Sequence, residues 1–178
     1  FLKQEYENSL FYYQRSLLIN KNSNHSNYHQ SLCFFFLGYL DESINILTKI
    51  IADNPYHADA FYYLGLNNKL LDNYNSAIKY LTQYLLLNPD DEETYLHLGI
   101  SYYKIKNNIR ASESLKRYLN YDHKNGEAHY YLAMIYENTL KLDKAMEQYN
   151  KAIKYDSDIM DAQYRLGMLY YNNNNYKL

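Results

Sequence analysis

The stretch "FYYLGLNNKLLDNYNSAIKYLTQYLLLNP", residues 61–89, contains two runs of apolar residues separated by the polar segment DNYN. In the first run Phe61, Leu64, Asn68 and Leu71 share one side of a helix, and residues 77, 78, 81, 84 and 85 do so in the second. DNYN is a turn signal, and a proline ends the second run. The stretch therefore predicts a helix, a short turn and a second helix.

The same pattern returns along the chain with a step of 34 residues. Three markers recur every 34 residues: a Leu-Gly pair in the first helix, an alanine in the second helix and the closing proline. In one repeat, Leu-Ala replaces Leu-Gly. The positions are Leu64–Gly65, Leu98–Gly99, Leu132–Ala133 and Leu166–Gly167, then Ala77, Ala111 and Ala145, then Pro55 and Pro89. Three separate markers thus agree on one period, which indicates an array of equal helical hairpins.

A 34-residue hairpin with an aromatic residue, Leu-Gly, a tyrosine, a later alanine and a closing proline resembles the tetratricopeptide repeat. The resemblance extends over the whole chain and implies an all-α fold, a right-handed superhelical solenoid of antiparallel helix-turn-helix units. It also implies that Gly65, Gly99 and Gly167 occupy the place where the two helices of a hairpin approach most closely. Close packing there would outweigh a helix-propensity cost of about 1 kcal/mol for glycine.

The register divides the chain, residues 1–178, into one array of repeats. Residues 24–57 are a weaker copy, because Gln30 and Ser31 replace Leu-Gly. Both ends of the chain fall inside a repeat, so we expect the sequence to be an excerpt of a longer protein. The predicted segments are 1–23 (a second helix), 24–57, 58–91, 92–125 and 126–159 (full repeats) and 160–178 (a first helix).

Composition and motifs argue against several classes of function. The net charge of −2 disfavours nucleic acid as a partner, and no apolar run is long enough to cross a membrane. There is no phosphate-binding glycine loop and no hydrolase motif, and the single Cys33 allows no intrachain disulfide. His25 and His29 lie one helical turn apart but lack a third metal ligand. We therefore expect that the protein is not an enzyme and binds no cofactor or metal. We also expect it to be cytoplasmic or nuclear.

The resemblance also implies a binding groove, because the first helices of such repeats line a concave surface. Tyr63, His97 and Tyr131 form an aromatic stripe along this groove with Leu66, Ile100 and Met134, suited to apolar side chains or an extended backbone. The predicted groove residues are Tyr28, His29, Asp59, Tyr62, Tyr63, Leu66, Lys69, Glu93, Leu96, His97, Ile100, Tyr103, Glu127, Tyr130, Tyr131, Met134, Asp161, Tyr164, Arg165 and Met168.

Four of these residues are acids at the same place in consecutive repeats: Asp59, Glu93, Glu127 and Asp161. An acid in the first turn of a helix interacts favourably with the helix dipole, which is one explanation. The other is a ladder that selects partners carrying Lys or Arg. The Lys, Asn and Arg carboxylate clamp, with which related repeats hold acidic tails of chaperones, is absent from the corresponding places.

We therefore predict a protein-protein interaction scaffold whose groove binds a neutral or basic peptide or helix of a partner, without the carboxylate clamp. One alternative is a structural segment of a subunit of a large assembly, as in the anaphase-promoting complex. Another is the non-catalytic repeat arm of an enzyme such as a glycosyltransferase.

Overall fold

The computed structural model describes the backbone of residues 2–21 and 23–175 and the side chains of residues 2–21 and 23–172. All regular secondary structure in this part of the chain is helical, which confirms the predicted all-α class. The helices fall into two compact units, Phe1–Asp90 and Asp91–Leu178, which are described separately below. The predicted terminal segments 1–23 and 160–178 include residues 1, 22 and 176–178, which lie outside the described residues.

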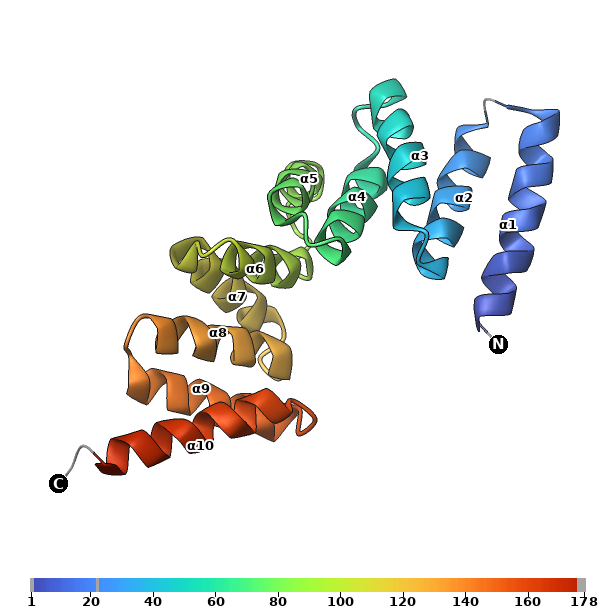
Figure 1. The fold of residues 1–178 in the computed structure, drawn as a ribbon. Coiled ribbons are helices and arrows are strands. Elements are labelled where there is room, and N and C mark those ends of the chain that lie inside the picture. Colours follow the sequence, from blue (N-terminus) through green and yellow to red (C-terminus); the bar gives the residue numbers. More distant parts are fainter. Residues whose placement is uncertain (1, 22, 176–178) are drawn as a thin grey trace. The chain divides into compact units, whose positions relative to one another are not determined.

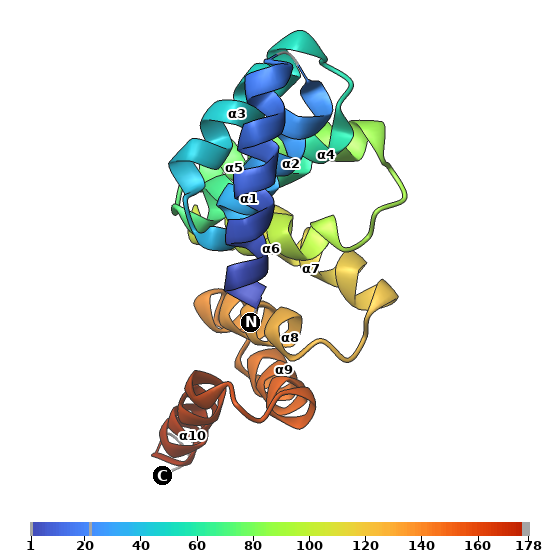
Figure 2. The ribbon, with the colours of Figure 1, turned by 90° about the vertical axis from the view of Figure 1, so that its right-hand side faces the viewer.

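The first unit holds the helices α1 to α5, each packed against the next along the chain (Figures 1 and 2). Its core includes Leu47, Ile50, Ala60 and Leu64, and tyrosines and isoleucines of α2 to α5 surround this core. The bounds are α1 (Leu2–Ile19), α2 (Asn24–Leu37), α3 (Leu40–Asp53), α4 (Ala58–Leu70) and α5 (Tyr74–Leu87).

The second unit has the same arrangement of consecutive antiparallel neighbours, with α6 also touching α8 (Figure 1). Its buried side chains form two clusters, one around Leu115 and Leu132 and the other around Tyr149 and Leu166. The bounds are α6 (Thr94–Lys104), α7 (Asn108–Tyr121), α8 (Gly126–Asn138), α9 (Leu142–Tyr155) and α10 (Met160–Asn175). None of the described helices has the length and apolar character needed to span a bilayer.

Two of the Leu-Gly glycines lie where neighbouring helices approach closely. A Cβ on Gly65 would lie 2.6 Å from Cγ of Leu81, and one on Gly99 would lie 2.6 Å from Cγ of Leu115. For Gly167 the prediction stays a prediction, because a Cβ there meets no atom within 4 Å in the described part of the chain. The described part of the chain contains no second helix after α10 that could pack against this glycine.

The turn inside each full hairpin contains one residue in the left-handed backbone conformation. These residues are 34 positions apart, and only the first is glycine: Gly38 (φ 85°), Asp72 (59°), Lys106 (63°) and Leu140 (56°). Gly38 shows why the conformation is needed, since it turns the N–H of Tyr39 back to donate to the carbonyl of Phe34 at 2.9 Å. In the other three turns a side chain occupies a place that glycine fills with least strain.

Candidate partner-binding site

In the first unit, α2 and α4 bring four predicted groove residues into one aromatic surface. Tyr28 and His29 of α2 lie against each other with ring centroids 5.4 Å apart, and Tyr62 and Tyr63 of α4 are 5.5 Å apart. The two helices meet where the ring of Tyr28 lies 6.4 Å from that of Tyr63. These edge-to-face pairs stabilise the surface and orient its rings.

Phe35 and Phe36 of α2 and Tyr6 of α1 extend this surface. Phe35 lies 5.3 Å and Phe36 6.4 Å from the ring of Tyr63, and Phe36 stacks on Tyr6 at 4.8 Å. Phe36 remains 47% exposed, so it is accessible to a partner. The run of three phenylalanines at the end of α2 was a visible signal, but the contribution of α1 depends on packing between helices. We call Tyr6, Tyr28, His29, Phe35, Phe36, Tyr62 and Tyr63 the aromatic surface.

Asp59 places a negative charge at the edge of the aromatic surface. It lies in the first turn of α4 and is exposed. Burial raises the pKa of the Tyr28 and Tyr63 phenols, and the Asp59 carboxylate raises both further, so it lies within electrostatic reach of both rings. The predicted residues Leu66 and Lys69 follow on α4, and both are half-buried.

The two histidines of α2 lie close together, with ring centroids 4.3 Å apart. His29 also stacks on Tyr13 of α1 at 5.4 Å. Burial lowers the pKa of His29, and the neighbouring His25 lowers it further. No cluster of three or more potential metal-binding side chains occurs within the described residues. These rings therefore extend the aromatic packing between α1 and α2.

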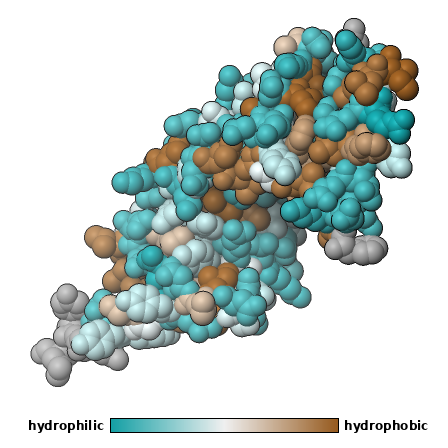
Figure 3. All heavy atoms as spheres, turned by 45° about the vertical axis from the view of Figure 1, so that its right-hand side comes forward, coloured by the Kyte–Doolittle hydropathy of each residue, from teal (hydrophilic) through white to brown (hydrophobic). Residues whose placement is uncertain are grey.

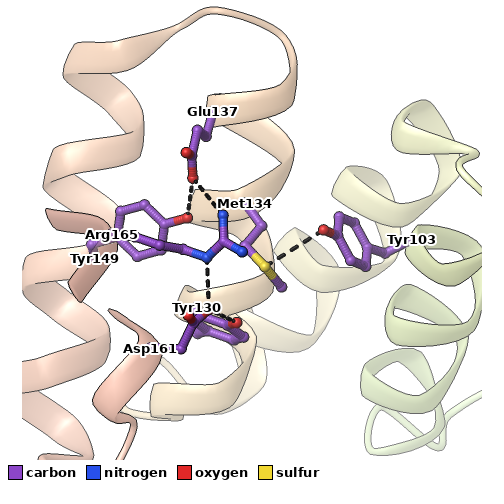
Figure 4. Close-up of polar contacts among 7 residues, drawn as sticks. All are labelled: Tyr103, Tyr130, Met134, Glu137, Tyr149, Asp161 and Arg165. Carbon is purple, nitrogen blue, oxygen red and sulfur yellow. Dashed lines mark hydrogen bonds and ion pairs between the residues drawn. The ribbon is translucent and has the colours of Figure 1, made fainter. Parts of the chain in front are cut away.

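In the second unit, part of the predicted stripe is buried. Ile100 of α6 is 2% exposed and Met134 of α8 is 6% exposed, so neither is available to a partner, contrary to the prediction. Met134 instead belongs to the core and accepts a hydrogen bond from the Tyr103 hydroxyl to its sulfur at 3.5 Å (Figure 4). Tyr131, whose ring lies 5.5 Å from Tyr103, stays partly exposed.

The remaining predicted residues of this unit lie at or near the surface. Tyr164 and Met168 of α10 are exposed. Glu93 and Glu127 are exposed, Glu93 directly before α6 and Glu127 in the first turn of α8. The partly exposed residues are Leu96, His97, Tyr103, Tyr130, Tyr131 and Arg165.

A polar network joins α8, α9 and α10 through Arg165 (Figure 4). The Arg165 Nε donates to Asp161 at 2.6 Å, and its Nη1 lies 3.3 Å from a carboxylate oxygen of Glu137. The hydroxyl of Tyr130 donates to Asp161, and that of buried Tyr149 donates to Glu137, each at 2.5 Å. The sequence predicted Tyr130, Asp161 and Arg165 as groove residues but not Glu137 and Tyr149.

The network gives Asp161 a structural role that neither explanation of the acidic series included. The hydrogen bond from Tyr130 lowers the pKa of the Asp161 carboxyl most, and the hydrogen bond from Arg165 lowers it further. One acid of the series is thus held by its own chain across two repeats. The network also uses Glu137, an acid that does not belong to the series.

Acid should weaken this network. Because the pKa of Asp161 is lowered by folding, its stabilising effect is present above the unfolded value of about 4 and is lost as the pH falls through the folded value. We expect Asp161→Asn to lower the free energy of unfolding by about 1 kcal/mol at neutral pH and less below pH ~4, as for a half-exposed ion pair. Urea denaturation at several pH values measures this. Asp158→Asn, which removes an exposed acid of the same unit, is the control, and equal pH profiles for the two variants would contradict the assignment.

Comparisons with known proteins agree with the repeat fold. Residues 59–91 match a family model described as a tetratricopeptide repeat, and residues 141–174 match one described as a TPR repeat. No curated protein matches the chain.

Several solved structures share the fold. YrrB, described as a TPR protein with an unusual peptide-binding site, superposes with a TM-score of 0.80 at 22% identity, covering 91% of this chain and 84% of that one. MamA from Desulfovibrio magneticus superposes with a TM-score of 0.79 at 20% identity, covering 88% of each chain. A thermophilic TPR protein of Thermus thermophilus superposes with a TM-score of 0.63 at 21% identity, covering 93% of this chain and 90% of that one. At these identities the likeness concerns the fold.

Proposed function

We propose that this chain, whose fold is that of tetratricopeptide repeat proteins, is a non-catalytic interaction scaffold that binds a peptide or helical segment of a partner protein. The segment lies across the first helices and presents apolar or basic side chains to the aromatic surface of the first unit. Protein binding is a common role of this fold, and YrrB, which shares it, is described as having a peptide-binding site.

The observation that carries the proposal is the aromatic surface beside Asp59. Its rings are held in place by one another before a partner arrives, so binding fixes few additional side chains. Tyr62 and Tyr63 are half-buried and Phe36 is exposed, so each keeps some surface for a partner. On the face drawn in Figure 3, hydrophobic side chains form separate patches among hydrophilic ones. Such preorganised, partly exposed rings are typical of residues that dominate binding energy.

Asp59 supports a preference for cationic partners. A Lys or Arg side chain placed over the ring of Tyr63 would gain a cation–π interaction of about 0.5–2 kcal/mol, and Asp59 would add an ion pair. An acidic segment would instead meet this carboxylate. The preferred partner of the first unit is therefore an apolar segment with at least one Lys or Arg.

The test is a peptide array on which each apolar peptide occurs in a lysine, a glutamine and a glutamate version. We expect the wild-type protein to prefer the lysine version, and Tyr63→Ala to weaken binding about tenfold or more, as for a central aromatic contact residue. Tyr56→Ala is the matched control, because this tyrosine belongs to the same unit, lies outside the surface and is 80% exposed.

Asp59→Lys separates charge from folding, since Asp59 is exposed and its replacement leaves the core intact. This variant should lose or reverse the preference for lysine while still binding apolar peptides. Binding that is equal for Tyr63→Ala and Tyr56→Ala, or a preference for glutamate in the wild-type protein, would refute the proposal.

A further inference from the structure

A surface cavity of about 470 Å³ lies in the second unit, at the end of α6. Its walls come from three places: the last turn of α6 and the turn after it, the start of α7, and the end of α8. The lining residues are Tyr103, Lys104, Lys106, Asn108 and Asn138. All five carry hydrogen-bond donors, and none is an acid.

In the described part of the chain, no ion pair neutralises the positive charge of this cavity. Within the described residues neither Lys104 nor Lys106 takes part in an ion pair, whereas Arg117, Lys151 and Arg165 of the same unit all do. Glu137 directly precedes Asn138 in the sequence, but it is held by Arg165 and Tyr149. The cavity also lies at the first residue of α7, where the helix dipole is positive.

The opposite end of the same helix has the opposite charge. Glu93 precedes α6 and is exposed, and α6 runs from there for 11 residues to Lys104. At 1.5 Å per helical residue, the backbones of Glu93 and Lys104 are about 16 Å apart along the helix axis, a distance that about five extended residues span. Tyr103, which directly precedes Lys104, and Tyr131 of α8, whose ring lies 5.5 Å from that of Tyr103, are both partly exposed.

We propose that the cavity is a subsite for the carboxylate of an Asp or Glu side chain in the partner segment, which also places an apolar side chain on Tyr103 and Tyr131. This inference rests on the proposed function and deepens it. The second unit selects an acidic residue about five positions from a neutral or basic one, whereas the first unit selects a basic residue. Lys104 and Lys106 bind the carboxylate, and Asn108 and Asn138 are within the cavity to donate further hydrogen bonds.

Lys106 offers a variant that removes the charge without harming the fold. Its backbone is left-handed, with φ 63°, at the place where Gly38 stands in the first full repeat. Lys106→Gly therefore relieves strain and should maintain or raise the melting temperature. Leu140→Gly is the matched control, because it makes the same backbone change in the next hairpin, at φ 56°, without touching the cavity.

The experiment is a titration of the whole chain with N-acetylglutamate, followed by amide chemical shifts, with N-acetylglutamine as the neutral probe. We expect N-acetylglutamate to shift the amides of residues 103–108 and 138 in a saturable manner, and N-acetylglutamine to shift them far less. Lys106→Gly should weaken this binding about fivefold, as for one exposed ion pair, and Leu140→Gly should leave it unchanged. Inorganic phosphate, titrated separately, should shift these amides less strongly than N-acetylglutamate.

Three results would overturn the inference: no difference between the charged and the neutral probe, equal binding by Lys106→Gly and the wild-type protein, or a response to phosphate alone. None of them affects the peptide-array test of the aromatic surface, which lies in the other unit. Conversely, loss of lysine preference on the array with an intact N-acetylglutamate response would refute the proposed function of the first unit and leave the carboxylate subsite standing.

Discussion

Gly99→Leu is expected to lower the free energy of unfolding by about 3 kcal/mol or more, as for strong overpacking of a core. Even the first added carbon would lie 2.6 Å from Cγ and 2.7 Å from Cδ2 of Leu115, and 3.2 Å from its backbone nitrogen. Leu115 is fully buried and cannot turn away without disturbing its neighbours. Urea denaturation followed by circular dichroism measures the loss.

Alanine at two glycines provides a matched pair for this prediction. Gly99→Ala should destabilise the protein, because the contact with Leu115 outweighs the gain in helix propensity. Gly167 occupies the same place in its repeat, but no atom lies within 4 Å of a Cβ added there. Gly167→Ala should therefore stabilise α10 by up to about 1 kcal/mol. Opposite signs are expected for the same chemical change. The same sign for both would show that propensity, not close approach, governs Gly99.

Raising the pH above 10 is expected to unfold the protein in one cooperative step. Burial is the largest cause that raises the pKa of six tyrosines above the ordinary value of about 10. Between the unfolded and folded pKa values the folded state binds more protons, so stability is full below pH ~10 and falls as the pH rises further. The six are Tyr28, Tyr63, Tyr118, Tyr130, Tyr131 and Tyr149.

Tyrosinate absorbance and far-ultraviolet circular dichroism measure this transition together, and the sequence contains no tryptophan to complicate the absorbance. Part of the tyrosinate signal should appear only with the loss of helix. Tyr149→Phe should reduce the steepness of the alkaline transition while costing about 1.5–3 kcal/mol at neutral pH, because it removes a hydrogen bond to the carboxylate of Glu137. Tyr164→Phe, at a largely exposed position, should change neither. Complete ionisation of the tyrosines with the helices intact would contradict the prediction.

The groove could be predicted only in part from the sequence. The repeat register placed Tyr28 and Tyr63 on consecutive first helices, and their rings lie 6.4 Å apart. The register could not tell that Met134 points into the core or that Asp161 is already occupied by Arg165 and Tyr130. Those outcomes depend on side chains of other helices. In the Tyr130–Asp161 pair, for example, the two partners are about thirty residues apart in the sequence.

The sequence by itself determined the helical hairpin and its period of 34 residues. Each hairpin repeats the same apolar places, and the residues that define them lie within a few turns of one another in the chain. The tertiary structure decided which places are tight. Gly126 illustrates this, because no repeat marker singled it out, yet a Cβ there would lie 2.5 Å from Cβ of Asp156 at the end of α9. Gly167 fits the pattern, but no second helix follows α10 in the described part of the chain, so no close approach occurs there. The physical reason is that a local pattern encodes a helix and its buried face, whereas close approach depends on which other helix lies against that face.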